Sequence, residues 1–113
     1  MRVANIVATL ALFTVVVSAK PSWCRYAHTY VEKKICRTPH LIDLDYELTN
    51  VYKRVKSILR DDRTLRKELI RSERDWVIER DTDCYHRSSR CIARKYRQRI
   101  NYLYRYLDDL MLE

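Results

Sequence analysis

The chain has 113 residues, and its 23 Lys and Arg against 15 Asp and Glu give a formal net charge of +8. A chain of this length forms one small domain. It contains no Gly and only two Pro. The residues that hairpin turns and phosphate-binding loops depend on are therefore missing, which excludes an all-β fold and a P-loop.

The N-terminal residues have the features of a secretory signal sequence. Arg2 precedes an apolar run over residues 6–17, and the small residue Ala19 follows it. This pattern predicts a signal peptide over residues 1–19, cleaved near Ala19, and a helical domain over residues 20–113. The uncharged run is marginal in length for a membrane span. We therefore expect a periplasmic or secreted protein with no stable membrane span after cleavage.

The cysteine content indicates either two disulfides or one metal site, since the chain has four: Cys24, Cys36, Cys84 and Cys91. An oxidising compartment favours disulfides. No two of the cysteines have the close spacing of a zinc-binding pair, and the three His show no regular relation to them. We therefore expect disulfides, no metal and no cofactor.

Two capping signals predict where the first two helices of the domain begin. Thr29 and Glu32 fit a capping box, which predicts a short helix that ends near Cys36. Thr38 and Pro39 predict the next start, because Thr caps helices and Pro suits their first position. Apolar residues then recur at intervals of three and four, as on the buried face of a helix from Pro39 to about Leu59: Leu41, Leu44, Leu48, Val51, Tyr52, Val55, Ile58 and Leu59.

Two further helices follow. Asp61 and Asp62 supply a turn and an N-cap for a helix that runs to about Asp81, with Leu65, Leu69, Trp76 and Val77 inward. The periodicity breaks over residues 82–90. A last helix then extends from about Cys91 to Leu110 with these residues inward: Ile92, Tyr96, Ile100, Leu103, Leu107 and Leu110.

The short connections make successive helices antiparallel. The sequence thus predicts an all-α fold, a three-helix antiparallel bundle with a short N-terminal helix. In this topology all four cysteines lie at one end of the bundle, where disulfides can staple it. We favour the pairs Cys24–Cys36 and Cys84–Cys91, although the crossed pairings remain open.

A further set of residues is spread over the whole domain: Cys24, Glu32, Ile35, Cys36, Leu41, Leu44, Asp45, Leu48, Tyr52, Trp76, Arg80, Asp81, Cys84, Cys91, Tyr96, Arg99 and Ile100. This pattern resembles the LprI-type lysozyme-inhibitor family of small secreted bacterial proteins. The resemblance covers nearly the whole domain, with Glu73 where the family usually has Gln and without the lipoprotein anchor of the family's namesake. It implies inhibition of muramidases that cleave peptidoglycan, but it identifies no inhibitory residues.

Three charged residues fall on or beside the inward faces of the predicted helices: Asp45, Glu73 and Arg80. Unpaired charges are costly to bury, so we expect a polar network in which Asp45 or Glu73 brackets Arg80. An acid/base pair of Glu73 and Asp45 for hydrolysis is the alternative. Structural ion pairs also perturb carboxylates, and we favour that interpretation and expect no enzyme.

Two surfaces are candidates for function. The first is a short cationic loop that a local disulfide would hold, and it is our hypothesis for an inhibitory wedge: Tyr85, His86, Arg87, Ser88, Ser89 and Arg90. The second is a basic ridge on one face of the last helix: Arg90, Arg94, Arg97 and Arg105. Such a ridge attracts polyanions, but export and the lack of a recognition motif argue against nucleic acid.

The sequence therefore supports two hypotheses. In the first, the protein inhibits a lysozyme or bacterial muramidase by stoichiometric occlusion of its active site. In the second, it is a non-enzymatic envelope protein whose basic ridge binds an anionic cell-wall polymer or a secretion component. The sequence does not separate a host enzyme from one made by the same cell.

Overall fold

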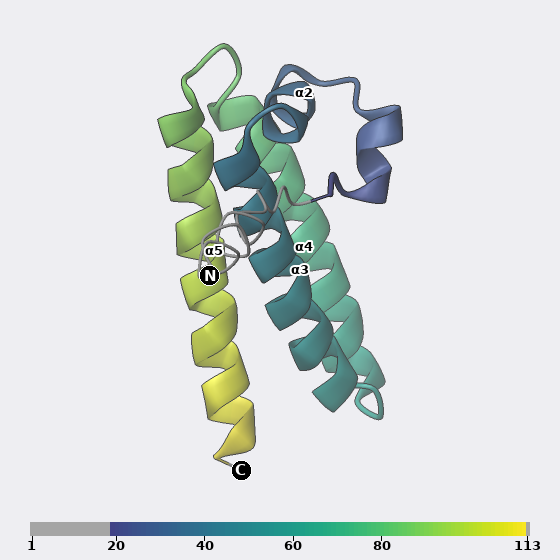
Figure 1. The fold of residues 1–113 in the computed structure, drawn as a ribbon. Coiled ribbons are helices and arrows are strands. Elements are labelled where there is room, and N and C mark those ends of the chain that lie inside the picture. The colour runs from purple at the N-terminus through teal and green to yellow at the C-terminus, as the bar shows by residue number, and fades with distance from the viewer. Residues whose placement is uncertain (1–18, 113) are drawn as a thin grey trace, which may run out of the picture.

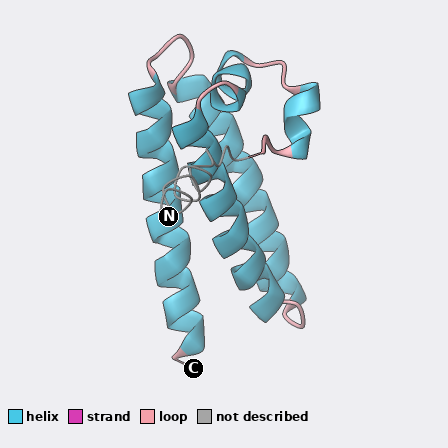
Figure 2. Cartoon of the chain, in the orientation of Figure 1, coloured by secondary structure: helices cyan, strands magenta, loops and turns pink. Residues whose placement is uncertain are grey.

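The computed structural model describes residues 19–112, and these form an all-helical domain, as predicted (Figures 1 and 2). Nearly all of the predicted signal peptide, residues 1–18, lies outside the described residues. The elements are the 3-10 helix η1 (Ser22–Tyr26) and the α-helices α2 (Tyr30–Cys36), α3 (Pro39–Ile58), α4 (Arg63–Asp83) and α5 (Ser89–Met111). The N-terminal part therefore holds two short elements where one was expected.

The three long helices alternate in direction. A tight turn joins α3 to the antiparallel α4, and a second loop returns the chain into α5 (Figure 1). As a result α3 and α5 run the same way, and their contact is the most extensive of any helix pair. The short elements η1 and α2 lie at the end where α3 and α5 begin (Figure 1). No helix in residues 19–112 combines the length and hydropathy needed to cross a bilayer.

Local capping explains two of the helix starts. Thr29 and Glu32 form the predicted capping box, with each side chain accepting a backbone N–H of the other residue. The Asp62 carboxylate accepts the Leu65 N–H at 3.1 Å and caps α4. The prediction for Thr38 was wrong in one respect. Its hydroxyl donates to the Lys34 carbonyl at 2.7 Å instead of capping α3, because α2 ends nearby and leaves that carbonyl available.

The core agrees with the predicted periodicity apart from the last turn of α3. Ile58 was expected inward but is 47% exposed, because Leu59, just past the helix, occupies the core position. Tyr52, Leu65, Val77 and Leu110 are partly buried against the core. The buried cluster contains the following residues: Val31, Ile35, Leu41, Leu44, Leu48, Val51, Val55, Leu59, Leu69, Trp76, Cys84, Ile92, Ala93, Tyr96, Ile100, Leu103 and Leu107.

Both disulfides are those that were favoured. Cys24–Cys36 joins η1 to the end of α2, and Cys84–Cys91 joins the end of α4 to the first turn of α5. The Cα–Cα distances of 5.8 and 5.7 Å are usual for disulfides. Every cysteine is thus paired, and none is available as a metal ligand.

The Asp62 cap gives a test of the α3–α4 turn. Asp62→Ala should lower the free energy of unfolding by about 1 kcal/mol, because the Leu65 N–H loses its acceptor. Urea denaturation followed by circular dichroism measures the change. The neighbouring Asp61→Ala is the matched control, since Asp61 is exposed and makes only a 3.8 Å ion pair with Arg60. Equal losses in the two variants would contradict the assignment of Asp62 as the cap.

Candidate functional site

The loop between α4 and α5 is shorter than predicted. Ser89 and Arg90 belong to the first turn of α5, so residues 84–88 connect the two helices, and we call the part after Cys84 the Tyr85–Ser88 loop. The Cys84–Cys91 disulfide closes it at the base. His86 has a φ of 55°, in the left-handed region, a conformation that His adopts more readily than most residues other than Gly.

Side-chain contacts attach this loop to α2 as well. The rings of Tyr30, Tyr85 and His86 form a cluster whose centroids lie 4.1–6.0 Å apart. The Tyr30 hydroxyl also donates to the Arg87 carbonyl at 3.1 Å. Tyr85 nevertheless stays 61% exposed, and the Arg87 side chain is exposed as well. The loop therefore presents an aromatic ring and a cation from a backbone fixed by three helices.

The basic ridge has the predicted position. Arg90, Arg94, Arg97 and Arg105 are all exposed along α5. Arg97 shares a hydrogen bond of 3.1 Å between its Nη2 and His40 Nε2, which ties one ridge residue to α3. The first ridge residue, Arg90, lies two residues after the Tyr85–Ser88 loop, in the first turn of α5.

The buried polar network differs from the prediction in its direct contacts. Arg80 Nε donates to Asp81 at 2.8 Å, and Arg80 Nη1 donates to the Tyr96 hydroxyl at 3.1 Å. Tyr96 in turn donates to Asp45 Oδ1 at 2.8 Å. The direct ion-pair partner of Arg80 is therefore Asp81, not Asp45 or Glu73, and Tyr96 relays the connection to Asp45. The Tyr96 hydroxyl, which accepts from Arg80 and donates to Asp45, takes the place of a direct pair between them.

Glu73 belongs to a separate pair. Its Oε1 accepts from Arg99 Nε at 3.0 Å. Burial raises the pKa of Glu73, and Arg99 offsets only part of this effect. The Nη2 atom of Arg99 is buried and has no hydrogen-bond partner among the described residues. Glu73 and Asp45 thus serve different buried networks, an arrangement that fits structural ion pairs.

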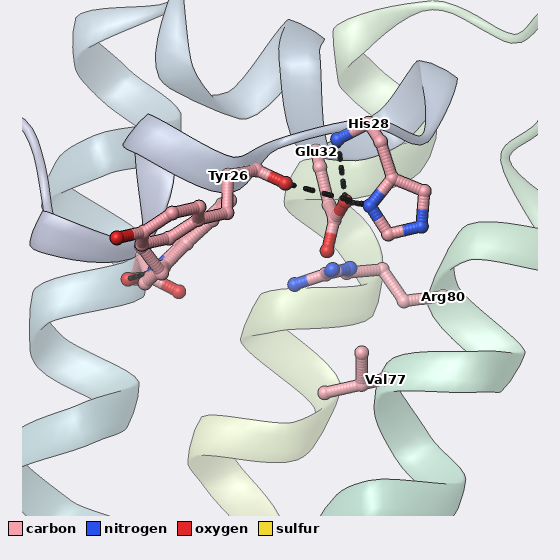
Figure 3. A pocket seen from close by; sticks show the side chains of 7 residues that line it. Tyr26, His28, Glu32, Val77 and Arg80 are labelled. Atoms are coloured by element: carbon pink, nitrogen blue, oxygen red, sulfur yellow. Dashed lines mark hydrogen bonds and ion pairs between the residues drawn. The ribbon is translucent and has the colours of Figure 1, made fainter.

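A pocket that the sequence did not predict lies beside η1 (Figure 3). Its volume is about 410 Å³, and we call it the η1 pocket. In Figure 3 the Glu32 carboxylate and the Arg80 guanidinium lie next to one another, with Tyr26 on one side of them and His28 on the other. Its lining comes from η1, α2, α3, α4 and the segment between η1 and α2: Trp23, Tyr26, His28, Glu32, Asp45, Val77 and Arg80.

Backbone groups favour the charged state of Glu32, one of the two acidic residues in this pocket. Burial opposes ionisation of Glu32, but its Oε1 accepts the N–H groups of His28 and Thr29 at 3.0 and 3.1 Å. These hydrogen bonds, together with His28 and Arg80, hold the pKa of Glu32 below its ordinary value. Glu32 is therefore a carboxylate at neutral pH.

Sequence reasoning overlooked this pocket for a physical reason. Trp23 and Tyr26 lie in a segment with no helical periodicity, so no pattern placed their rings. The capping box gives Glu32 a structural role, so its presence in the sequence does not indicate a pocket. The one available signal was two aromatic residues, three apart, flanking a cysteine that pairs locally.

Comparison with known proteins identifies one family. The model of the family described as "Lysozyme inhibitor LprI" matches residues 24–103 of this chain. The match includes all four cysteines, both ends of the Tyr85–Ser88 loop and the residues of the buried networks. No curated protein and no solved structure matches the chain.

The relay role of Tyr96 leads to a stability prediction. Tyr96→Phe should lower the free energy of unfolding by about 1–3 kcal/mol, because Asp45 Oδ1 and Arg80 Nη1 lose a buried partner. Urea denaturation provides the value. Tyr104→Phe removes the hydroxyl of an exposed tyrosine on the same helix, and its effect should stay within about 0.5 kcal/mol. A Tyr96→Phe variant as stable as this control would rule out the relay.

The lowered pKa of Glu32 predicts a pH dependence. Between its folded and unfolded pKa values, the unfolded chain binds the additional proton, so acid shifts the equilibrium toward unfolding. The stability advantage of the native protein over Glu32→Gln should be complete above about pH 5.5 and shrink as the pH falls below about 4.3. Urea denaturation from pH 7 to pH 3 tests this, with Glu47→Gln, at an exposed site on α3, as the control for loss of a carboxylate. A constant difference between native protein and Glu32→Gln at every pH would contradict the assignment.

Proposed function

Since this chain belongs to the LprI lysozyme-inhibitor family, we propose that it inhibits a lysozyme-like muramidase by stoichiometric occlusion of the active site. The Tyr85–Ser88 loop and the adjoining first turn of α5 enter the cleft. The observation that carries this proposal is the exposed Tyr85 and Arg87 on a loop held by a disulfide, an aromatic cluster and the Tyr30 hydrogen bond.

The chemistry of the two surfaces is complementary. A muramidase cleft contains two carboxyl groups, one acting as general acid and one as nucleophile or base. A guanidinium forms charge-assisted, bidentate hydrogen bonds to a carboxylate, so Arg87 suits this cleft. Tyr85 is the kind of exposed aromatic residue that fills a pocket at the centre of an interface. Neither contact requires catalysis by the inhibitor, and we propose none.

Rigidity supports the same proposal. Binding a flexible loop costs conformational entropy for each side chain and backbone unit that becomes ordered. Most of this conformational entropy is already lost when the protein folds. Tyr30 and His86 pack against Tyr85, and the Cys84–Cys91 disulfide closes the base of the loop. The free and bound conformations of the backbone should then be similar.

The compartment supports the proposal as well. Two disulfides fit an extracellular or periplasmic location, where peptidoglycan and its muramidases are found. We propose that the protein reaches it after signal-peptide cleavage near Ala19. Animal-type lysozymes are themselves basic, so long-range repulsion would slow association at low salt, and rising salt should leave inhibition intact or improve it.

The exposed ridge favours a second candidate function. Arg90, Arg94 and Arg105 extend into solvent along α5, which suits binding to an anionic cell-wall polymer or a secretion component. Polyanion binding depends on released counterions and should fall steeply as salt rises. Salt dependence therefore distinguishes the two candidates, and an Arg94→Ser/Arg105→Ser double variant should weaken only the second.

The occlusion proposal predicts the effect of one substitution in the loop. Arg87→Ala should weaken inhibition at least tenfold, the effect of losing roughly 1.4 kcal/mol or more at an interface hot spot. The measurement is muramidase activity on cell-wall substrate with increasing oxidised protein, against both an animal lysozyme and a bacterial muramidase. Native protein should give saturable inhibition near a one-to-one ratio.

Arg54→Ala is the matched control, because it removes one exposed positive charge from α3. It should inhibit like the native protein. Equal weakening by the two substitutions would show that net charge matters and the loop does not. No inhibition of either enzyme at excess protein would reject the proposed function.

A further inference from the structure

The η1 pocket is a second candidate site, separate from the Tyr85–Ser88 loop. None of its lining residues belongs to that loop. Its volume of about 410 Å³ falls in the range of small-molecule sites. The proposed inhibition of muramidases does not use it, so its ligand is an independent question.

One side of the pocket is a fixed aromatic surface. Trp23 Nε1 donates to Asp45 Oδ2 at 3.2 Å, which anchors the indole to α3. The Cys24–Cys36 disulfide ties the same turn of η1 to α2. Tyr26, three residues after Trp23, is 75% exposed at the rim. The Trp23 ring therefore offers apolar surface whose position is set before any ligand arrives, and Tyr26 adds an exposed ring at the rim.

Arg80 and Glu32, which line another side of the pocket, each have a polar atom that remains available for a hydrogen bond. Arg80 is only 4% exposed and uses Nε for Asp81 and Nη1 for Tyr96. Neither of these two bonds uses Nη2, and Arg80 is one of the residues that line the pocket. Glu32 likewise accepts only through Oε1. A donor nitrogen and an acceptor oxygen thus remain available where Glu32 and Arg80 lie next to one another (Figure 3).

The charged residues that line the pocket disfavour the binding of an ionic ligand. The carboxylates of Glu32 and Asp45 repel an anion, and the guanidinium of Arg80 repels a cation. A neutral ligand avoids both penalties if it supplies an acceptor for Arg80 and a donor for Glu32. It must also carry an apolar face for the aromatic side of the pocket.

We propose that the η1 pocket binds a neutral pyranose sugar, with an N-acetylated hexosamine as the best match. The C–H face of a pyranose packs on Tyr26 and Trp23. Its hydroxyl groups both donate and accept hydrogen bonds, and one of them donates to Glu32. The acetamido carbonyl, a strong acceptor, receives the Nη2–H of Arg80.

The test is a titration of the oxidised full domain with tri-N-acetylchitotriose, followed by backbone amide NMR and by tryptophan fluorescence. Trp23 lines the pocket, whereas Trp76 is buried but packs on Arg80, so loss of the fluorescence change in a Trp23→Phe variant would assign it to Trp23. Chemical-shift changes should concentrate on η1 and the start of α2. Tyr26→Ala should weaken binding at least about tenfold. Tyr104→Ala, which removes another exposed tyrosine far along α5, should bind like the native protein.

A charged analogue tests the selection for neutrality. Glucosamine, which lacks the acetyl group and carries an ammonium, should bind at least about tenfold more weakly than N-acetylglucosamine. Tighter binding of glucosamine would identify a cation site and overturn the proposal. Absence of chitotriose binding, or binding unaffected by Tyr26→Ala, would also overturn it. No muramidase is present in this experiment, so its outcome is independent of the inhibition assay.

Discussion

A single chain of buried and partly buried hydrogen bonds connects the elements of this domain. Trp23 of η1 and Tyr96 of α5 both donate to Asp45 of α3, and Arg80 of α4 donates to Tyr96. Asp81 then closes the chain by accepting from Arg80 and from the Thr29 hydroxyl at the start of α2. Apolar packing alone permits helices to slide or rotate, whereas buried polar groups must find their partners. The network therefore fixes the register of the helices and the placement of η1.

This network also holds the η1 pocket and the Tyr85–Ser88 loop in place. The η1 pocket has Asp45 and Arg80 in its lining, so its shape depends on the same bonds that align α3, α4 and α5. The Tyr85–Ser88 loop depends on α2 through Tyr30, and α2 is held by the Thr29–Asp81 hydrogen bond. A short helix of seven residues has little stability of its own. Tertiary contacts on both sides of α2 therefore stabilise it.

Features encoded by neighbouring residues could be predicted, and features that depend on helix register could not. The capping box at Thr29, the Asp62 cap and the long helices follow from local signals. The partner of Arg80 was mistaken because Tyr96 was counted only as an apolar core residue, although its hydroxyl is what reaches Asp45. The η1 pocket was missed because Trp23 lies outside any periodic segment.

The order of the disulfides has a consequence for how the protein matures. Each cysteine pairs with the next one along the chain, at separations of 12 and 7 residues. If the polypeptide enters an oxidising compartment N-terminus first, Cys24 and Cys36 can meet before Cys84 has emerged. Oxidation in order of appearance then gives the native connectivity directly, with no mispaired intermediate that an isomerase must rearrange. Consecutive pairing thus suits the domain to rapid oxidation to its native disulfides.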